Sequence, residues 1–265
     1  MRSYPKIAAD MFWTLMSWTF GFLGVMIIIN IVQRAINVIQ GTEVDGGFYG
    51  SLIIASNIYM LIIGIISIYF LPYYVENGVT RKDYFKGTLI ASIGVSIVLP
   101  IIIFFISIVE RFILTNWLNM SYKTQDINEI FNEVLMDIDG GLGSFIGDLI
   151  LSVILSPNMD PYSNWMLAIV VFASNIFIFY LLGWLISAGF YRGGTIIGLG
   201  FIVIAIAINT LKDTLLRIAL DLPFSARFSA LEPFSSWIAI AGILLLILLS
   251  VWFIRLLTKK VTIDI

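Results

Sequence analysis

The stretch YYVENGVTRKDYFK, residues Tyr73–Lys86, separates two long apolar segments, Gly50–Pro72 and Thr88–Val109, neither of which contains a charged residue. A helix of ~20 apolar residues is long enough to cross the ~30 Å hydrocarbon core of a membrane. Lys and Arg collect in the cytoplasmic loops of membrane proteins. The stretch carries three basic residues: Arg81, Lys82 and Lys86. The sequence therefore predicts a tight intracellular hairpin between two membrane spans.

The composition extends this interpretation to the whole chain. Of 265 residues, 60% are hydrophobic and only 12% are charged, which is more apolar surface than a soluble domain of this size carries. The chain has no cysteine and no histidine. Disulfides, most zinc sites and Ser–His catalysis are thereby excluded.

We predict an all-α polytopic membrane protein with a single transmembrane domain, residues 1–265, and six transmembrane helices. The expected spans are Phe12–Ile39, Gly50–Pro72, Thr88–Val109, Trp165–Phe190, Thr195–Leu211 and Ser235–Ile254. Four further segments are expected outside the spans: an interfacial helix (1–11), a cytoplasmic coupling hairpin (73–87), an extracytoplasmic helical region (112–164) and an outer re-entrant hairpin (212–233).

The placement of basic residues predicts the orientation. The proposed inner segments hold nine basic residues against four acidic ones, and this excess of Lys and Arg places both termini in the cytoplasm. The nine are Arg2, Lys6, Arg81, Lys82, Lys86, Arg192, Arg255, Lys259 and Lys260, and the four are Asp10, Glu76, Asp83 and Asp264.

A few polar side chains lie within the predicted spans. Polar groups at this depth usually face protein or water rather than lipid. We therefore expect the best candidates to line the path of a transported molecule between two copies of the chain: Asn30, Gln33, Asn57 and Asn175. The alternative is that they make hydrogen bonds between helices, worth ~0.6 kcal/mol on average. Arg34 is interpreted as the end of the first span. The span cores otherwise hold no ionisable group, which disfavours self-contained ion-coupled transport.

Three parts of the chain, in this order, resemble the permease subunits of the ABC-2 class of ABC exporters. Segment 1–11 resembles the connecting helix of that family. The run Gly78–Arg81 (Gly-Val-Thr-Arg) resembles the Gly-x-Ser/Thr-Arg run of its intracellular loop after the second span, and segment 212–233 resembles its outer re-entrant helices. The outer region 112–164 is larger than the family minimum.

The resemblance implies a homo- or heterodimer of two permeases, each docking a separate cytoplasmic ABC ATPase. ATP and Mg²⁺ then bind the partner ATPase, and this chain, which lacks a Gly-x-x-x-x-Gly-Lys-Ser/Thr loop, holds no cofactor and is not an enzyme. The cargo would be amphipathic, such as a peptide, an antimicrobial or a lipid, and the setting a bacterial plasma membrane. No nucleic-acid partner is expected.

The ATPase-docking surface is expected on the hairpin, with Gly78 providing its sharp bend. It consists of Glu76, Gly78, Val79, Thr80, Arg81, Lys82, Asp83 and Phe85, with Val79, Tyr84 and Phe85 as apolar anchors inside a polar rim. In the alternative interpretation, Arg81 and Lys82 only hold the topology by contacting anionic lipid, at ~1 kcal/mol each. A second candidate function is a non-transporting immunity or sensory protein that binds a partner in the membrane.

Overall fold

The computed structural model describes residues 4–40, 48–116, 156–222, 228, 231 and 233–259. Its helices are α1 (Tyr4–Gln40), α2 (Phe48–Ser67), α3 (Phe70–Glu76), α4 (Arg81–Asn116), α7 (Trp165–Ala219) and α8 (Ser236–Lys259). No strand occurs in these ranges. These helices fall in five stretches that are long and apolar enough to cross a membrane, one of which, Phe48–Glu76, contains both α2 and α3. The predicted all-α class is therefore confirmed over the part of the chain that the structure describes.

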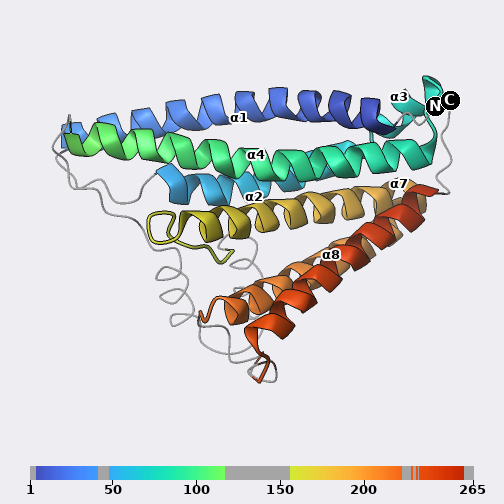
Figure 1. The fold of residues 1–265 in the computed structure, drawn as a ribbon. Coiled ribbons are helices and arrows are strands. Elements are labelled where there is room, and N and C mark those ends of the chain that lie inside the picture. Colours follow the sequence, from blue (N-terminus) through green and yellow to red (C-terminus); the bar gives the residue numbers. More distant parts are fainter. Residues whose placement is uncertain are drawn as a thin grey trace.

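Helix α7 is a hairpin of two arms. Gly194 has non-helical backbone angles (φ 71°, ψ −170°), and the positive φ is one that glycine adopts without strain. The rings of Phe190 and Phe201 fill the space beside Gly198 and Gly189, respectively, so the two arms pack against each other. The chain reverses at the Gly193-Gly194 pair (Figure 1), and each arm has the length of one membrane span.

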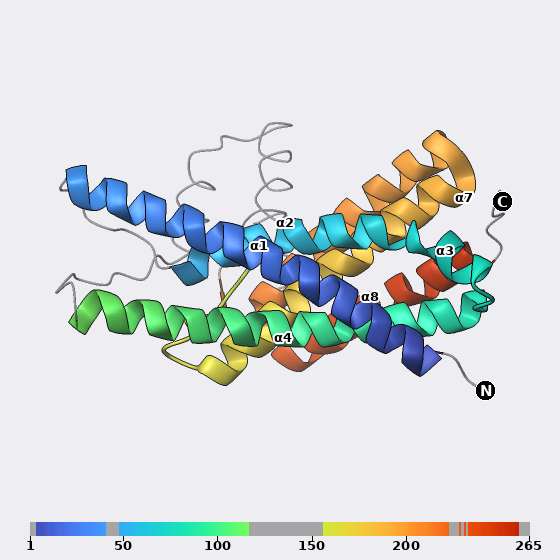
Figure 2. The same ribbon diagram turned by 90° about the horizontal axis from the view of Figure 1, so that it is seen from above.

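The helices form two groups that run side by side. Helix α1 packs mainly on α4, whereas α2 and α8 pack on the hairpin α7, and α4 joins the two groups through α7. Figures 1 and 2 show both termini, α3 and the turn of α7 at the same end of the molecule. The helical passes therefore alternate in direction around a core that includes Leu52, Met60, Phe172 and Trp184.

The first expected segment differs in the structure. Residues Tyr4–Met11 are the opening turns of α1 and not a separate interfacial helix. The side chain of Ile7 packs against Gly87 of α4, and Met11 is fully buried. Because the apolar face that contacts α4 already begins at Ile7, no break separates these residues from the span.

The other boundaries also shift. Helix α2 ends at Ser67, and Pro72 lies in the first turn of α3, where a missing N–H is tolerated. The expected hairpin 73–87 therefore comprises the end of α3, a short turn and the start of α4. Of the expected outer region 112–164, residues 112–116 belong to α4, 156–164 are irregular, and 117–155 lie outside the described residues.

The expected re-entrant segment 212–233 begins differently in the structure, and its residues 223–227, 229, 230 and 232 lie outside the described residues. Residues Lys212–Ala219 continue the second arm of α7 as helix. Leu211, just before this segment, and Leu215 and Ile218 within it recur at helical spacing and pack with apolar residues of the first arm of α7 and of α8. Helical packing therefore extends past the charged residues at which the sequence interpretation ended the span.

Candidate functional site

The α3–α4 hairpin is a tightly bonded turn. The backbone N–H groups of Gly78 and Val79 donate to the carbonyls of Val75 and Tyr74, each at 3.0 Å. Gly78 has φ 78°, the left-handed conformation that favours glycine. The Thr80 hydroxyl accepts from the Asp83 N–H at 3.1 Å and caps α4. The short turn thus reverses the chain where the sequence predicts a bend.

The expected docking residues divide by exposure. Glu76, Gly78, Thr80 and Lys82 are exposed, whereas Val79, Arg81 and Asp83 are half-buried. The Arg81 guanidinium donates to the carbonyl of Lys259 in α8 at 3.4 Å. A polar rim is therefore present on the hairpin surface, with Val79 partly packed into the core below it.

The structure corrects the role expected for Tyr84 and Phe85. Tyr84 is fully buried, and its hydroxyl donates to the carbonyl of Ser67. The Phe85 side chain is 7% exposed, and its ring centroid lies 5.5 Å from that of Trp184 and 5.3 Å from the Arg255 guanidinium carbon. Both rings hold the hairpin to the helices, and neither is a surface anchor in this conformation.

The predicted path residues do not come together in the chain. Asn30 accepts a hydrogen bond from Arg34, and Gln33 lies on the exposed side of α1. Asn57 is fully buried in α2, and neither of its amide atoms has a hydrogen-bond partner within the described ranges. Asn175 is buried in the first arm of α7. These four amides occupy separate environments, so they line no single path within one protomer.

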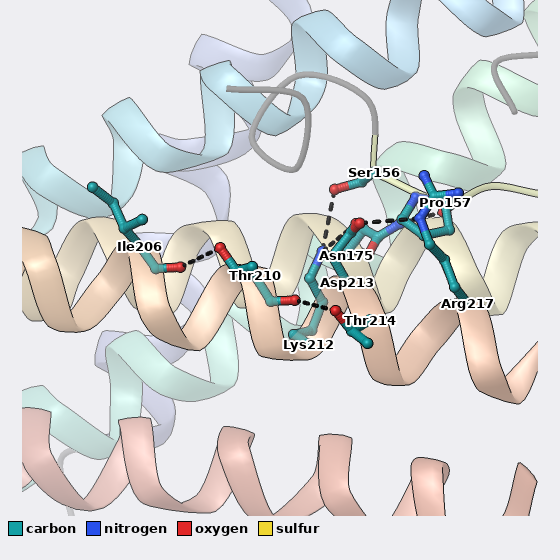
Figure 3. Close-up of polar contacts among 9 residues, drawn as sticks. All are labelled: Ser156, Pro157, Asn175, Ile206, Thr210, Lys212, Asp213, Thr214 and Arg217. Atoms are coloured by element: carbon teal, nitrogen blue, oxygen red, sulfur yellow. Dashed lines mark hydrogen bonds and ion pairs between the residues drawn. The ribbon is translucent and has the colours of Figure 1, made fainter. Parts of the chain in front are cut away.

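Asn175 belongs to a buried polar cluster that was not predicted from the sequence (Figure 3). Its Nδ2 donates to the carbonyl of Pro157 at 2.9 Å, and its Oδ1 accepts from Lys212 Nζ at 3.1 Å. Lys212 Nζ also donates to Ser156 Oγ at 3.1 Å. The cluster therefore joins both arms of α7 to the irregular segment that precedes them.

Two more ionised side chains complete this cluster. Arg217 Nε donates to Asp213 Oδ2 at 3.2 Å, and Lys212 Nζ lies 3.8 Å from Asp213 Oδ1. Lys212 and Arg217 are 0% and 1% exposed. The charges face protein, as intramembrane ionisable groups usually do. Helix α7 therefore carries these ionisable groups beyond Leu211, where the sequence ends the fifth span, and the expectation that the span cores hold none stays a prediction.

The buried polar cluster around Lys212 and the polar contacts of the α3–α4 hairpin each have a structural role. The cluster satisfies the ammonium group of Lys212 with uncharged oxygens and fixes the two arms of α7 together. The hairpin contacts fix the turn between α3 and α4. Over the described ranges, no group of three or more acidic residues could hold a metal ion. Comparison with family models, with curated proteins and with solved structures gives no match.

Proposed function

We propose that this chain is the permease subunit of an ATP-driven exporter of the ABC-2 class and that it docks a separate cytoplasmic ATPase at the α3–α4 hairpin. The observation that carries the proposal is the position of this hairpin. It protrudes at the same end as both termini (Figure 1) and exposes a charged rim, Glu76 and Lys82, around the Gly78 turn.

The contacts of the hairpin with the membrane helices support a role in transmitting movement of the ATPase to them. The Tyr74 hydroxyl donates to Asp10 of α1, and the Tyr84 hydroxyl donates to the end of α2. Phe85 packs on Trp184 of α7, and Arg81 donates to the end of α8. A partner that moves the hairpin would therefore act on four other helices at once, because each is bonded to or packed on it.

The remaining parts of the proposal follow from this docking. In this proposal the chain crosses a bacterial plasma membrane six times, counting the arms of α7 separately. Both termini then lie on the same side of the membrane, and the distribution of Lys and Arg makes that side the cytoplasm. A second permease protomer would complete the membrane core, and ATP and Mg²⁺ would bind the partner ATPase. The cargo would be an amphipathic molecule, and its path would lie between the two protomers, as expected from the sequence.

The test is capture of an ATPase by the tagged full-length chain. A candidate ABC ATPase from the adjacent reading frame is co-expressed and co-purified, and ATP-dependent cargo export is measured. Lys82→Glu and Val79→Ser should each weaken capture and export. Arg111→Glu is the matched control, because it makes the same change from a basic to an acidic side chain at an exposed position near the other end of α4, far along the helix from the hairpin.

Two results would count against the proposal. Capture that is unaffected by both hairpin variants would remove the docking role of the α3–α4 turn. Failure of any ATPase to co-purify, with the chain intact in the membrane, would instead favour the non-transporting immunity or sensory protein.

A further inference from the structure

A cavity of about 640 Å³ is lined by residues of α1 and α4 and by Phe48 of α2. Figure 2 shows that the end of α1 and the end of α4 lie at the end of the molecule opposite both termini. The cavity volume is within the range of small-molecule sites. Nine of its twelve lining residues are apolar: Ile27, Ile31, Ala35, Ile39, Phe48, Ile106, Val109, Ile113 and Leu114. Its three polar lining residues are Asn30, Arg34 and Glu110. The cavity is thus an apolar chamber with one polar corner.

The polar corner is an ordered ion pair. Arg34 Nη2 donates to Glu110 Oε1, and Arg34 Nε donates to Asn30 Oδ1 at 2.9 Å. The backbone N–H of Phe48 donates to Glu110 Oε2 at 3.0 Å. Arg34 Nη1 makes no hydrogen bond with the residues that the structure describes, and each carboxylate oxygen keeps a second lone pair. The corner can therefore still donate to an anion and accept from a cation.

The position of the corner matches the outer boundary of a bilayer. Arg34 and Glu110 lie in the last turns of their helices, and Ile27 is seven residues earlier in α1, a separation of about 10 Å along the helix at ~1.5 Å per residue. Ile31, Ile39 and Val109 are 61%, 84% and 57% exposed. The chamber therefore opens sideways, toward the side that faces lipid in the proposed arrangement, with its charges at headgroup depth.

We propose that this cavity binds one acyl chain of a phospholipid whose headgroup carries a primary ammonium, such as phosphatidylethanolamine. The acyl chain lies along Ile27, Ile31 and Ile106. The phosphate accepts from Arg34 Nη1, and the ammonium group donates to the Glu110 carboxylate. Charge-assisted hydrogen bonds of this kind are the strong ones.

Charge complementarity selects this occupant over other amphiphiles. An anionic lipid such as phosphatidylglycerol would bring its phosphate near the Glu110 carboxylate and offer that group only neutral hydroxyl donors, with no positive charge to offset the repulsion between like charges. A choline headgroup would offer a cation that has no N–H. This inference goes beyond the proposed export function and does not depend on an ATPase.

The test is lipid binding by the purified full-length chain in detergent, measured by native mass spectrometry. The protein is titrated with phosphatidylethanolamine, phosphatidylglycerol and phosphatidylcholine of identical acyl chains. Phosphatidylethanolamine should bind most tightly. Ala35→Trp fills the chamber from an exposed position, and Arg34→Gln removes the guanidinium. Each should weaken phosphatidylethanolamine binding by about tenfold or more, the loss expected for a charge-assisted hydrogen bond or a blocked site.

Gln33→Ala is the control, because Gln33 is exposed on α1 and does not line the cavity. Its lipid binding should equal that of the unchanged chain. Full phosphatidylethanolamine binding by Ala35→Trp would overturn the site, whether or not Arg34→Gln folds. Equal binding of phosphatidylglycerol and phosphatidylethanolamine would overturn the headgroup assignment.

Discussion

The crossing of α2 with the first arm of α7 makes a sharp prediction about stability. A Cβ atom added at Gly64 would lie 2.1 Å from the carbonyl oxygen of Tyr180, and one added at Gly183 would lie 2.1 Å from that of Leu61. Ordinary contacts of a Cβ atom begin near 3.4 Å. Since the atoms that would be met belong to helix backbones, neither can rotate away, and the helices must separate by more than about 1 Å.

The magnitude follows from that separation. A gap of ~0.5–1 Å already forfeits a quarter to a half of each dispersion contact along the crossing. Overpacking costs ~1–3 kcal/mol, and backbone contact places Gly64→Ala at the upper end. The gain in helix propensity, up to ~1 kcal/mol, offsets part of this. We expect a net loss of about 2 kcal/mol, which lowers the melting temperature by ~4–8 °C.

The assay is thermal unfolding of the purified full-length chain in detergent, followed by tryptophan fluorescence. Trp184 is fully buried beside this crossing and reports on it. Gly24→Ala in α1 is the matched control, because a Cβ atom there meets nothing within 4 Å. It should melt at or slightly above the unchanged chain. A Gly64→Ala protein that melts with the Gly24→Ala protein would refute the close approach of the two backbones.

Two further predictions concern the buried cluster and the topology. Lys212→Met leaves Asn175 Oδ1 without its ammonium donor and should cost ~3 kcal/mol in thermal unfolding, whereas Lys86→Met, at an exposed position, should cost little; similar losses would contradict the cluster. The chain has no native cysteine, so single cysteines can be introduced at the exposed positions Asn77 and Thr115. An impermeant thiol reagent should label Asn77→Cys only from the cytoplasmic side and Thr115→Cys only from the outer side. Labelling of both from the same side would contradict the six-pass topology.

The sequence predicts the helices well because their length and apolar character are local properties. A run such as Thr88–Val109, which lies wholly within α4, must form a helix in a membrane, since every backbone group there must be hydrogen-bonded within the chain. The reversal at Gly194 is likewise visible, because a Gly-Gly pair beside Arg192 and between two apolar runs is a turn signal. These features depend on neighbours in the chain.

The buried contacts could not be predicted because their partners are distant in the chain. Asn175 lies 37 residues from Lys212, and the composition near Lys212 resembles a helix end. The periodic apolar residues Leu211, Leu215 and Ile218 were the one available signal that the arm continued. Phe85 shows the same limit: its burial depends on Trp184, which belongs to a different helix.

The turn at Gly194 has a consequence for the biogenesis of the chain. In the proposed orientation, the far end of the second arm of α7 must be carried across the hydrocarbon during insertion, together with its three charged side chains. Unpaired, these would cost about 9 kcal/mol at ~3 kcal/mol each near the membrane centre.

The contacts of the cluster indicate how that barrier is lowered. Asp213 and Arg217 are four residues apart on one helix, so their pair forms as soon as the nascent helix does. Lys212 finds Asn175 only on the first arm. The turn is too short for the arms to insert separately, and we expect the translocon to release α7 as a preassembled two-helix unit.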